Sequence, residues 1–275
     1  RIEVTPASVT IAAGETRQLT ARAFASNNVE IPGVAFVWTT SNQNVVSVSG
    51  SGVATGVTEG KAEVIASAGG VISSPVSIVV LPPPIAGIGQ VIINEALVAV
   101  DSGNTQARDF VELYNQTSGT LDISGLLVSF RQSGASNTVL TVSLPGAVGS
   151  RTSLIGPQGY FLIANGTQAY GTTADFDASS TNPPNGFNLN NTTGGIKLEI
   201  GGAKLDGLTY QGSSTAPPSI FLSFGEGAVL TFTGGTTNDL LRTPNGTDTN
   251  SNANDFRRNG TTASITPKRV NPTLP

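Results

Sequence analysis

The chain has 275 residues, of which 38% are hydrophobic and only 12% are charged, and it is rich in Gly and Pro. Its formal net charge of −4 argues against nucleic-acid binding, and no apolar run is long enough to span a membrane. It contains no Cys and no His, which excludes disulfides, thiolate zinc sites and the most common general base. Any catalysis would depend on carboxylate, Lys or Tyr side chains.

Apolar and polar residues alternate near the start of the chain, at 19–25 and at 34–38. This period of two predicts half-buried strands. Trp38 is the only Trp and lies on an apolar face, so we expect it to pack in a core rather than stack on a ligand. The chain opens with Arg1 and contains no Met, which is typical of a piece processed from a longer precursor.

A run of three prolines marks a domain boundary in LPPPIAGIG, residues 81–89. Prolines cannot continue a sheet, and in series they favour an extended, semi-rigid spacer. We therefore predict a first domain at 1–81, a proline-rich linker at 82–87 and a second domain at 88–275.

Apolar and polar residues also alternate in the second half of the chain. IKLEI (196–200) is the clearest half-buried strand, and YFLIA (160–164) predicts a strand buried on both faces. Gly201 and Gly202 predict a two-residue hairpin turn. TNDLLR (237–242) is the one segment that we expect to form a helical turn. The fold class is therefore predicted to be all-β.

The first domain resembles a known family. The segments IEVTPASVTIAAGETRQLTARAF and VWTTSNQNVVSVSGSGVATGVTEGKAEVIAS, within residues 1–81, are similar to a group 2 bacterial immunoglobulin-like domain. The family recurs in bacterial surface adhesins. The resemblance implies an immunoglobulin-like sandwich outside a bacterial cell.

The second domain resembles a lamin-tail domain in its bacterial extracellular form. The motifs are VIINEAL, DFVELYN, LDISGLLVSF, GYFLIAN and LDGLTY, followed by LRTPNGTDTNSNANDF and TPKRVNP. The resemblance implies a second immunoglobulin-like sandwich, so we predict two in tandem, and it implies no catalysis. Residues 172–187 and parts of 211–238 are expected to be insertions. The chromatin role of animal lamin tails does not carry over to an acidic chain.

Three acidic residues, Glu95, Asp109 and Glu112, lie in the two strands that open the second domain. Paired carboxylates on neighbouring strands can reach the spacing used by glycosidases, about 5–9 Å. We favour a structural role for Glu112, in which Arg131, Arg242 or a backbone amide satisfies a half-buried charge. A carboxylate-based hydrolase is the less favoured alternative.

Residues 246–256, GTDTNSNANDF, place Asp or Asn on every second position. Such spacing is found in calcium loops. A helix–loop–helix calcium loop needs Gly at its sixth position and an acid at its twelfth. Counted from Asp248, this segment has neither residue. We interpret these side chains as bonding to nearby backbone amides. A weak calcium site is the alternative, with Asp248, Asn250, Asn252 and Asp255 as its candidate ligands.

Taken together, these features predict a non-enzymatic structural or adhesive protein of a bacterial cell surface, with no cofactor and no catalytic residue. Self-association through the terminal segments would make it a filament or surface-layer subunit. The alternative is a glycan- or ligand-binding module of a larger secreted protein, although its four Tyr are scattered along the sequence.

Overall fold

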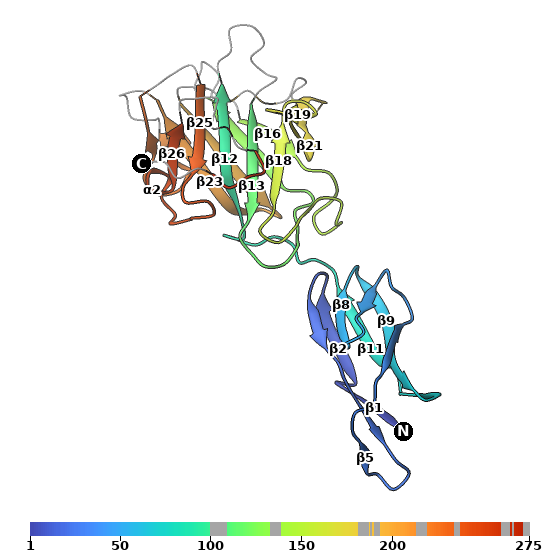
Figure 1. Ribbon diagram of the computed structural model, residues 1–275. Coiled ribbons are helices and arrows are strands. Elements are labelled where there is room, and N and C mark those ends of the chain that lie inside the picture. The colour runs from blue at the N-terminus through green and yellow to red at the C-terminus, as the bar shows by residue number, and fades with distance from the viewer. Residues whose placement is uncertain are drawn as a thin grey trace. The chain divides into compact units, whose positions relative to one another are not determined.

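The computed structural model describes residues 1–99, 109–132, 139–180, 187, 189, 193–212, 219–233, 237–259, 265 and 267–271. Nearly all regular structure in this part of the chain is β-strand (Figure 1). The chain divides into two compact units, which we call the first domain (Arg1–Pro84) and the second domain (Ile85–Pro275). Both are built from mainly antiparallel sheets. The predicted fold class, all-β with two immunoglobulin-like sandwiches, is confirmed.

The first domain has three sheets with the strand orders β1-β4-β5, β10-β9-β11-β2 and β3-β8-β7, and β6 pairs with β9. The strands are β1 (Ile2–Thr5), β2 (Ser8–Ala12), β3 (Thr16–Gln18), β4 (Thr20–Phe24), β5 (Glu30–Ile31), β6 (Val37–Thr40), β7 (Val46–Val48), β8 (Val53–Gly56), β9 (Gly60–Ala68), β10 (Val71–Ile72) and β11 (Val76–Leu81).

The core of the first domain is made of small aliphatic side chains, with Leu19, Val46 and Ile78 among those that are fully buried. Trp38 is only partly buried and packs against the edge of this core. Gly52 has a φ of +83°, and a Cβ at this position would lie 2.8 Å from the Trp38 ring. Trp38 therefore contributes to the core, as predicted, and needs a glycine beside it.

The second domain has two large sheets with the orders β21-β18-β13-β12-β25-β26 and β16-β15-β22-β23-β24, and two small ones, β14-β17 and β19-β20. Its elements are β12 (Val91–Ala99), β13 (Phe110–Asn115), β14 (Leu121–Asp122), β15 (Leu127–Gln132), β16 (Val139–Ser143), β17 (Leu154–Ile155), β18 (Tyr160–Ala164), β19 (Gln168–Ala169), β20 (Thr172–Thr173), β21 (Phe176–Asp177), η1 (Ala178–Ser180), β22 (Thr193–Ile200), β23 (Ala203–Gln211), α1 (Ser219–Leu222), β24 (Leu230–Thr231), β25 (Thr237–Arg242), α2 (Asn252–Asp255) and β26 (Phe256–Asn259).

The clearest strand predictions of the second domain are confirmed. IKLEI alternates buried and half-buried side chains in β22, and YFLIA is buried along nearly all of β18. Gly201 and Gly202, both with positive φ, turn β22 into β23. The helical turn expected at 237–242 is wrong, because this segment is strand β25, paired with β12 on one side and β26 on the other.

Two groups of apolar side chains stabilise the second domain. The main core fills the space between the two large sheets. A smaller cluster, with Leu97, Phe110 and Leu162 at its centre, lies on the other face of the six-stranded sheet. We call this face the outer face. It is where several polar residues of interest are found.

The ends of the predicted linker and insertions can be placed in part. The N–H of Ala86 donates to the Asp122 carbonyl oxygen at 2.9 Å, so the second domain holds this residue. Residues 172–180 form β20, β21 and η1, whereas 181–186 lie outside the described residues. Residues 211–238 contain α1 and β24, and 213–218 and 234–236 also lie outside the description.

Candidate functional site

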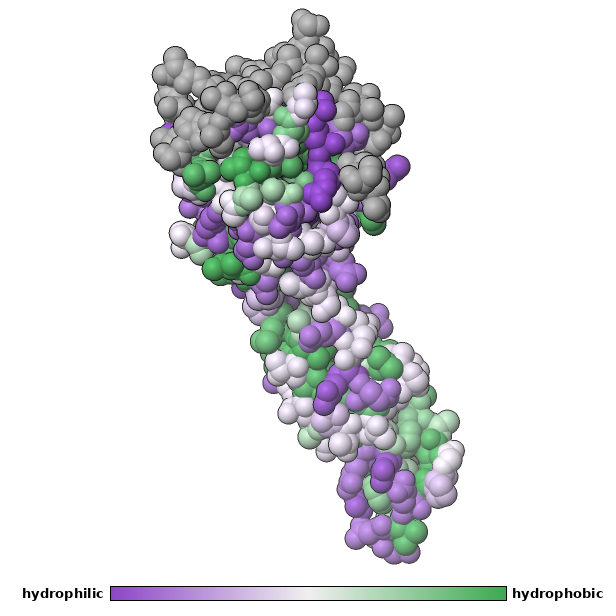
Figure 2. Space-filling view, turned by 90° about the vertical axis from the view of Figure 1, so that its left-hand side faces the viewer, coloured by the Kyte–Doolittle hydropathy of each residue, from purple (hydrophilic) through white to green (hydrophobic). Residues whose placement is uncertain are grey.

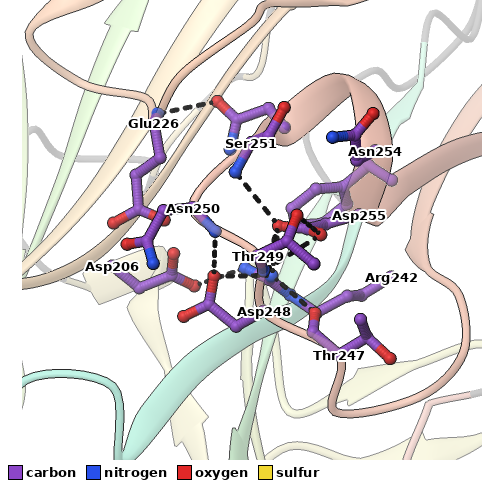
Figure 3. A network of polar contacts seen from close by, with 12 residues as sticks. Asp206, Glu226, Arg242, Thr247, Asp248, Thr249, Asn250, Ser251, Asn254 and Asp255 are labelled. Carbon is purple, nitrogen blue, oxygen red and sulfur yellow. Dashed lines mark hydrogen bonds and ion pairs between the residues drawn. The ribbon is translucent and has the colours of Figure 1, made fainter.

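An extensive polar network of the second domain surrounds Arg242, a fully buried side chain at the end of β25 (Figure 3). Its Nη2 donates to Asp206 Oδ2 at 2.8 Å, and its Nη1 lies 3.2 Å from Asp255 Oδ2 and 3.4 Å from Asp248 Oδ1. Its Nε donates to the Ile93 carbonyl oxygen at 2.8 Å. A buried guanidinium needs such partners for its donors.

A bulge in β12 makes room for this network. The register between β12 and β13 shifts between Ile93 and Glu95. At the bulge the Ile93 N–H donates to Asp206 Oδ2 at 2.6 Å, while the Ile93 carbonyl oxygen accepts from Arg242. Bulges redirect groups in this way. Because Asp206 lies on β23 and Arg242 on β25, the ion pair joins the two large sheets.

Asp206, Glu226 and Asp248 form a cluster of carboxylates whose oxygens lie within 4.8 Å of one another. Burial, together with the neighbouring Asp206 and Asp248, raises the pKa of Glu226 to about 8, so Glu226 carries a proton at neutral pH and hydrogen-bonds to Asp206. Burial also raises the pKa of Asp206, against the pull of the Arg242 guanidinium. The proton on Glu226 and the Arg242 guanidinium thus offset part of the negative charge of these three carboxyl groups.

Asp255 holds the loop 246–256 together from inside. Its carboxylate accepts from the N–H and Oγ1 of Thr249, at 2.6 to 3.1 Å, and from the Ser251 N–H at 3.3 Å. Arg242 Nη1 also donates to the Thr247 carbonyl oxygen at 2.8 Å. The bonds from Asp255 to the N–H groups of Thr249 and Ser251 are the side chain-to-backbone bonds predicted for this loop.

Asn252 links the same loop to β23. Its Oδ1 accepts from the N–H groups of Thr209 and Glu226 at 2.9 Å each, and its Nδ2 donates to the Gly207 carbonyl oxygen at 2.7 Å. The side chain is 1% exposed. These three hydrogen bonds of the Asn252 side chain fix the position of the loop against β23.

The four candidate calcium ligands have different surroundings. Asp248 belongs to the carboxylate cluster, and its Oδ1 accepts from the Asn250 N–H at 3.1 Å. The side-chain oxygens of Asn252 and Asp255 accept backbone N–H groups instead. Calcium favours six to eight oxygen ligands, and an ion beside Asp248 would meet the Arg242 guanidinium. Calcium binding by these four residues stays the untested alternative to the structural interpretation of this loop.

Two of the three acids expected in the opening strands, Glu95 and Glu112, lie on the six-stranded sheet, whereas Asp109 lies one residue before β13. Glu95 and Glu112 are directly opposite each other on β12 and β13, and both are fully buried. Glu112 accepts from Asn94 Nδ2 at 2.9 Å and from the backbone N–H of Lys268. Asp109 lies elsewhere, where its Oδ2 accepts from the Leu189 N–H at 2.7 Å.

The arginine partners expected for Glu112 are therefore wrong, and the backbone-amide alternative is correct. Arg242 is bound to Asp206, Asp248 and Asp255, and the Arg131 guanidinium lies over the Phe221 and Phe224 rings. Lys268 is 156 positions away from Glu112. No spacing rule connects residues so distant, so the sequence did not point to this contact.

The tyrosines are also dispersed in space. Tyr114 and Tyr160 form a tilted pair with ring centroids 5.1 Å apart, Tyr170 lies against Phe110, and Tyr210 is fully buried. The sequence also gave no sign of Asp206 and Glu226 as members of the Arg242 network. The only local signal of this network was that Arg242 directly follows two apolar residues. An Arg buried with such residues requires acidic partners.

Residues 1–75 match the family model of the bacterial Ig-like domain (group 2). The predicted family of the first domain is confirmed by this match. No curated protein matches the chain. Among the described residues, no helix is long and apolar enough to cross a membrane.

Several solved structures are similar to this chain at low sequence identity. Domains 5–6 of the S-layer protein SbsC are 15% identical, cover 76% of this chain and 94% of their own length, and give a TM-score of 0.27. A DUF4876 family protein from Bacteroides thetaiotaomicron is 11% identical, with 90% and 93% covered and a TM-score of 0.40. The Yersinia pseudotuberculosis adhesin InvE is 15% identical, with 76% and 57% covered and a TM-score of 0.29.

Proposed function

We propose that this chain is a non-enzymatic structural or adhesive module of a bacterial cell-surface protein, located outside the cell. The observation that carries the proposal is the match of residues 1–75 to the bacterial Ig-like domain model. The absence of Cys and His supports a role without thiol or imidazole chemistry. The test is antibody labelling of intact and permeabilised producer cells. Equal labelling of both supports the proposal, and labelling only after permeabilisation contradicts it.

The contacts of the buried acids support a structural role rather than hydrolysis. Glu95 and Glu112 have no exposed surface, and Glu112 is bonded to Asn94 and Lys268. An open groove of about 630 Å³ beside β2 and β3 contains one carboxylate, Glu15, which accepts the Ala12 N–H at 2.8 Å. Turnover of a polysaccharide or ester that is lost in Glu112→Gln, with the fold intact, would contradict the proposal.

For the second domain we propose membership of the lamin-tail family. The motif segments of the resemblance supply β12, β13, β15, β18 and β23, in the order of the family, and these strands form the centre of both large sheets. A crystal structure of residues 85–275, superposed on a known lamin-tail domain, tests the proposal. A different strand order in that structure would reject it.

Self-association into a filament or surface layer is the finer part of the proposal. Residues 2–5 pair with β4, and Lys268 and Asn271 bond to the second domain, so the described parts of both terminal segments are bound within their own domains. Edge strands are therefore the better candidates for contacts between copies. β5 and β10 are edges with exposed Ile31 and Ile72, and Figure 2 shows hydrophobic patches on the first domain. Light scattering at high concentration, with calcium present, tests this, and a persistent monomer would reject it.

A further inference from the structure

Strand β2 of the first domain has an edge that is open to pairing. β2 ends the sheet β10-β9-β11-β2, so β11 lies on one side of it and, in the described part of the chain, no strand lies on the other (Figure 1). Its sequence, SVTIA, contains neither a charged residue nor a proline, which are the usual devices that keep an edge from pairing with another chain. Val9 and Ile11 are buried in the core and hold the strand in place.

The backbone groups on the open side of β2 belong to Ser8, Thr10 and Ala12. The Ala12 N–H donates to Glu15 Oε2 at 2.8 Å, and the Ala12 carbonyl oxygen accepts from the Glu15 N–H at 3.1 Å, so both groups of Ala12 point away from β11. The N–H and C=O groups of successive residues in a strand point to alternate sides. Those of Ser8 and Thr10 therefore also point away from β11, and no hydrogen bond from a described residue reaches them on this side.

Strand β3 has an open edge of the same kind. β3 is the outer strand of the sheet β3-β8-β7. The Leu19 N–H donates to the Gly52 carbonyl oxygen at 2.8 Å, and the Gly56 N–H donates to the Glu15 carbonyl oxygen at 3.0 Å. Residues 15, 17 and 19 thus direct their backbone groups to this sheet, so the backbone groups of Thr16 point away from it.

The two edges line the open groove of about 630 Å³ beside β2 and β3. Ser8 and Thr10 belong to its β2 side, and Thr16 and Arg17 to its β3 side. The groove exists because the chain pairs with β4 up to Thr5 and then crosses to β11, which leaves β3 without a strand in line with β1. The groove therefore offers backbone donors and acceptors together with exposed hydroxyl groups.

The shape of the groove favours a lone extended segment over the edge of a folded sheet. A strand of a folded sheet brings a hydrogen-bonded neighbour about 4.8 Å away on its far side. Beside β2 that place is taken by β3, which lines the opposite side of the groove. A single extended segment has no such neighbour, so its main chain can pair with β2 while its side chains contact the groove.

The charges of the groove favour a segment that carries a carboxylate. Arg17 is exposed, and no described carboxylate forms an ion pair with it. Glu15, the other charged residue that lines the groove, already accepts the Ala12 N–H. An Arg with five free donors beside a strand edge matches an acidic side chain on the incoming segment.

We propose that the groove between β2 and β3 is a docking site for an extended, acidic peptide segment of a partner protein, which adds a strand to the open edge of β2 and places a carboxylate at Arg17. The inference goes beyond the proposed surface role and does not depend on it. It assigns recognition to the main chain of β2 and charge selection to a single side chain.

Peptide selection on the full chain tests the docking site. Short random peptides displayed on phage are panned against the chain, and the selected peptides are synthesised and titrated into isotope-labelled protein. We expect the NMR signals of the Ser8, Thr10 and Thr16 amides to shift and their hydrogen exchange to slow. Failure to select any peptide, or peptides that shift only signals away from the groove, would overturn the proposal.

Edge variants then show whether the main chain of β2 makes the contact. Thr10→Pro removes an N–H of the open edge and no bond to β11, so the affinity for the selected peptides should fall at least about tenfold. Thr10→Val keeps this N–H and is the matched control, with unchanged affinity expected. If Thr10→Pro fails to fold by circular dichroism, Ser8→Pro replaces it. Equal affinity of the Pro and Val variants would refute strand addition.

A charge variant tests the role of Arg17. Arg17→Met should weaken binding of the selected peptides and remove most of its dependence on salt. Arg22→Met is the control, because Arg22 is exposed on β4 and lies 3.6 Å from Glu30. Selected peptides without an acidic residue, or an equal effect of both variants, would contradict the assignment of charge selection to Arg17.

Sedimentation of the full chain without peptide tests the rival occupant, a second copy of this chain. We expect the parent and Thr10→Pro to sediment as the same species. An oligomer that Thr10→Pro dissociates would show that a second copy fills the groove, and would overturn the assignment to a segment of another protein.

Discussion

Arg242 and Asp206 form an ion pair that joins the two sheets of the second domain, with 2.8 Å between Nη2 and Oδ2 and no exposed surface on either side chain. Asp206 lies on a strand of the five-stranded sheet and Arg242 on a strand of the six-stranded sheet. The pair thereby acts as a polar link across a largely apolar core. Its partners in the loop 246–256 extend this link to the last strand.

Replacing Arg242 by Met should strongly destabilise the second domain. The substitution leaves Asp206 and Asp255 buried without their cation, and breaking a buried pair from one side costs about 3–5 kcal/mol. Urea unfolding followed by circular dichroism measures the loss. Arg257→Met is the matched control, since Arg257 donates mainly to carbonyl oxygens at the end of α2. An Arg242→Met variant within about 0.5 kcal/mol of the parent would contradict this.

Asp255→Ala should lower the stability of the second domain with or without calcium. The side chain is 1% exposed and accepts hydrogen bonds from Thr249, Ser251 and Arg242. Leaving these donors buried and unpaired costs about 1–3 kcal/mol. Asn254→Ala, at the exposed neighbouring position, is the control and should change little. A loss of stability seen only in the presence of calcium would speak for a metal ligand instead.

The second domain should lose stability as pH rises from about 5 to about 8. The pKa values of Glu112 and Asp239 are raised from 4.5 and 3.8 to about 8 and about 7, with burial as the main cause. In this range the folded domain holds protons that the unfolded chain has released, so the free energy of unfolding falls with pH. At about 1.4 kcal/mol per pKa unit, Glu112 alone contributes on the order of a few kcal/mol.

Urea midpoints at pH 5, 7 and 9 check this dependence. Glu112→Gln should flatten the curve, because the Gln side chain does not titrate. A free energy of unfolding that increases over the same range, or that has the same slope in the variant, would show that the buried acids do not set the pH dependence.

Trp38→Ala should unfold the first domain and leave the melting transition of the second unchanged. Trp38 is partly buried against the core, so the cost should be near the lower end of the 3–5 kcal/mol typical of truncating a core aromatic, about 3 kcal/mol. Calorimetry resolves the two transitions, and Val37→Ala, whose side chain is 63% exposed, is the control. A single transition that shifts as a whole would show that the domains do not unfold independently.

The sequence predicted features that depend on neighbours along the chain. IKLEI, YFLIA and the turn at Gly201 and Gly202 follow from local periodicity and backbone freedom, and all three are present. TNDLLR was misassigned because its local pattern is ambiguous and its strand is fixed by pairing with β12 and β26. Tertiary contacts override local preference in such short segments.

The polar sites could not be predicted as sites, because their members are far apart in sequence. Asp206 and Arg242 are 36 positions apart, and Glu112 and Lys268 are 156 apart. The loop 246–256 was correctly interpreted as bonding to its own backbone through Asp255. Its further link to β23 through Asn252 depends on how the sheets pack, which local spacing does not specify.

We expect the buried charges around Arg242 to stabilise the second domain rather than to hold a metal ion. Thermal unfolding of the full chain in calcium and in chelator tests it most directly, because an ion that binds only the folded state raises the melting temperature. We predict that the parent chain melts at the same temperature in calcium and in chelator. The Asp248→Ala variant should likewise melt at one temperature in both buffers. A parent melting temperature several degrees higher in calcium, with the difference abolished by Asp248→Ala, would contradict the claim and identify the loop as a calcium site.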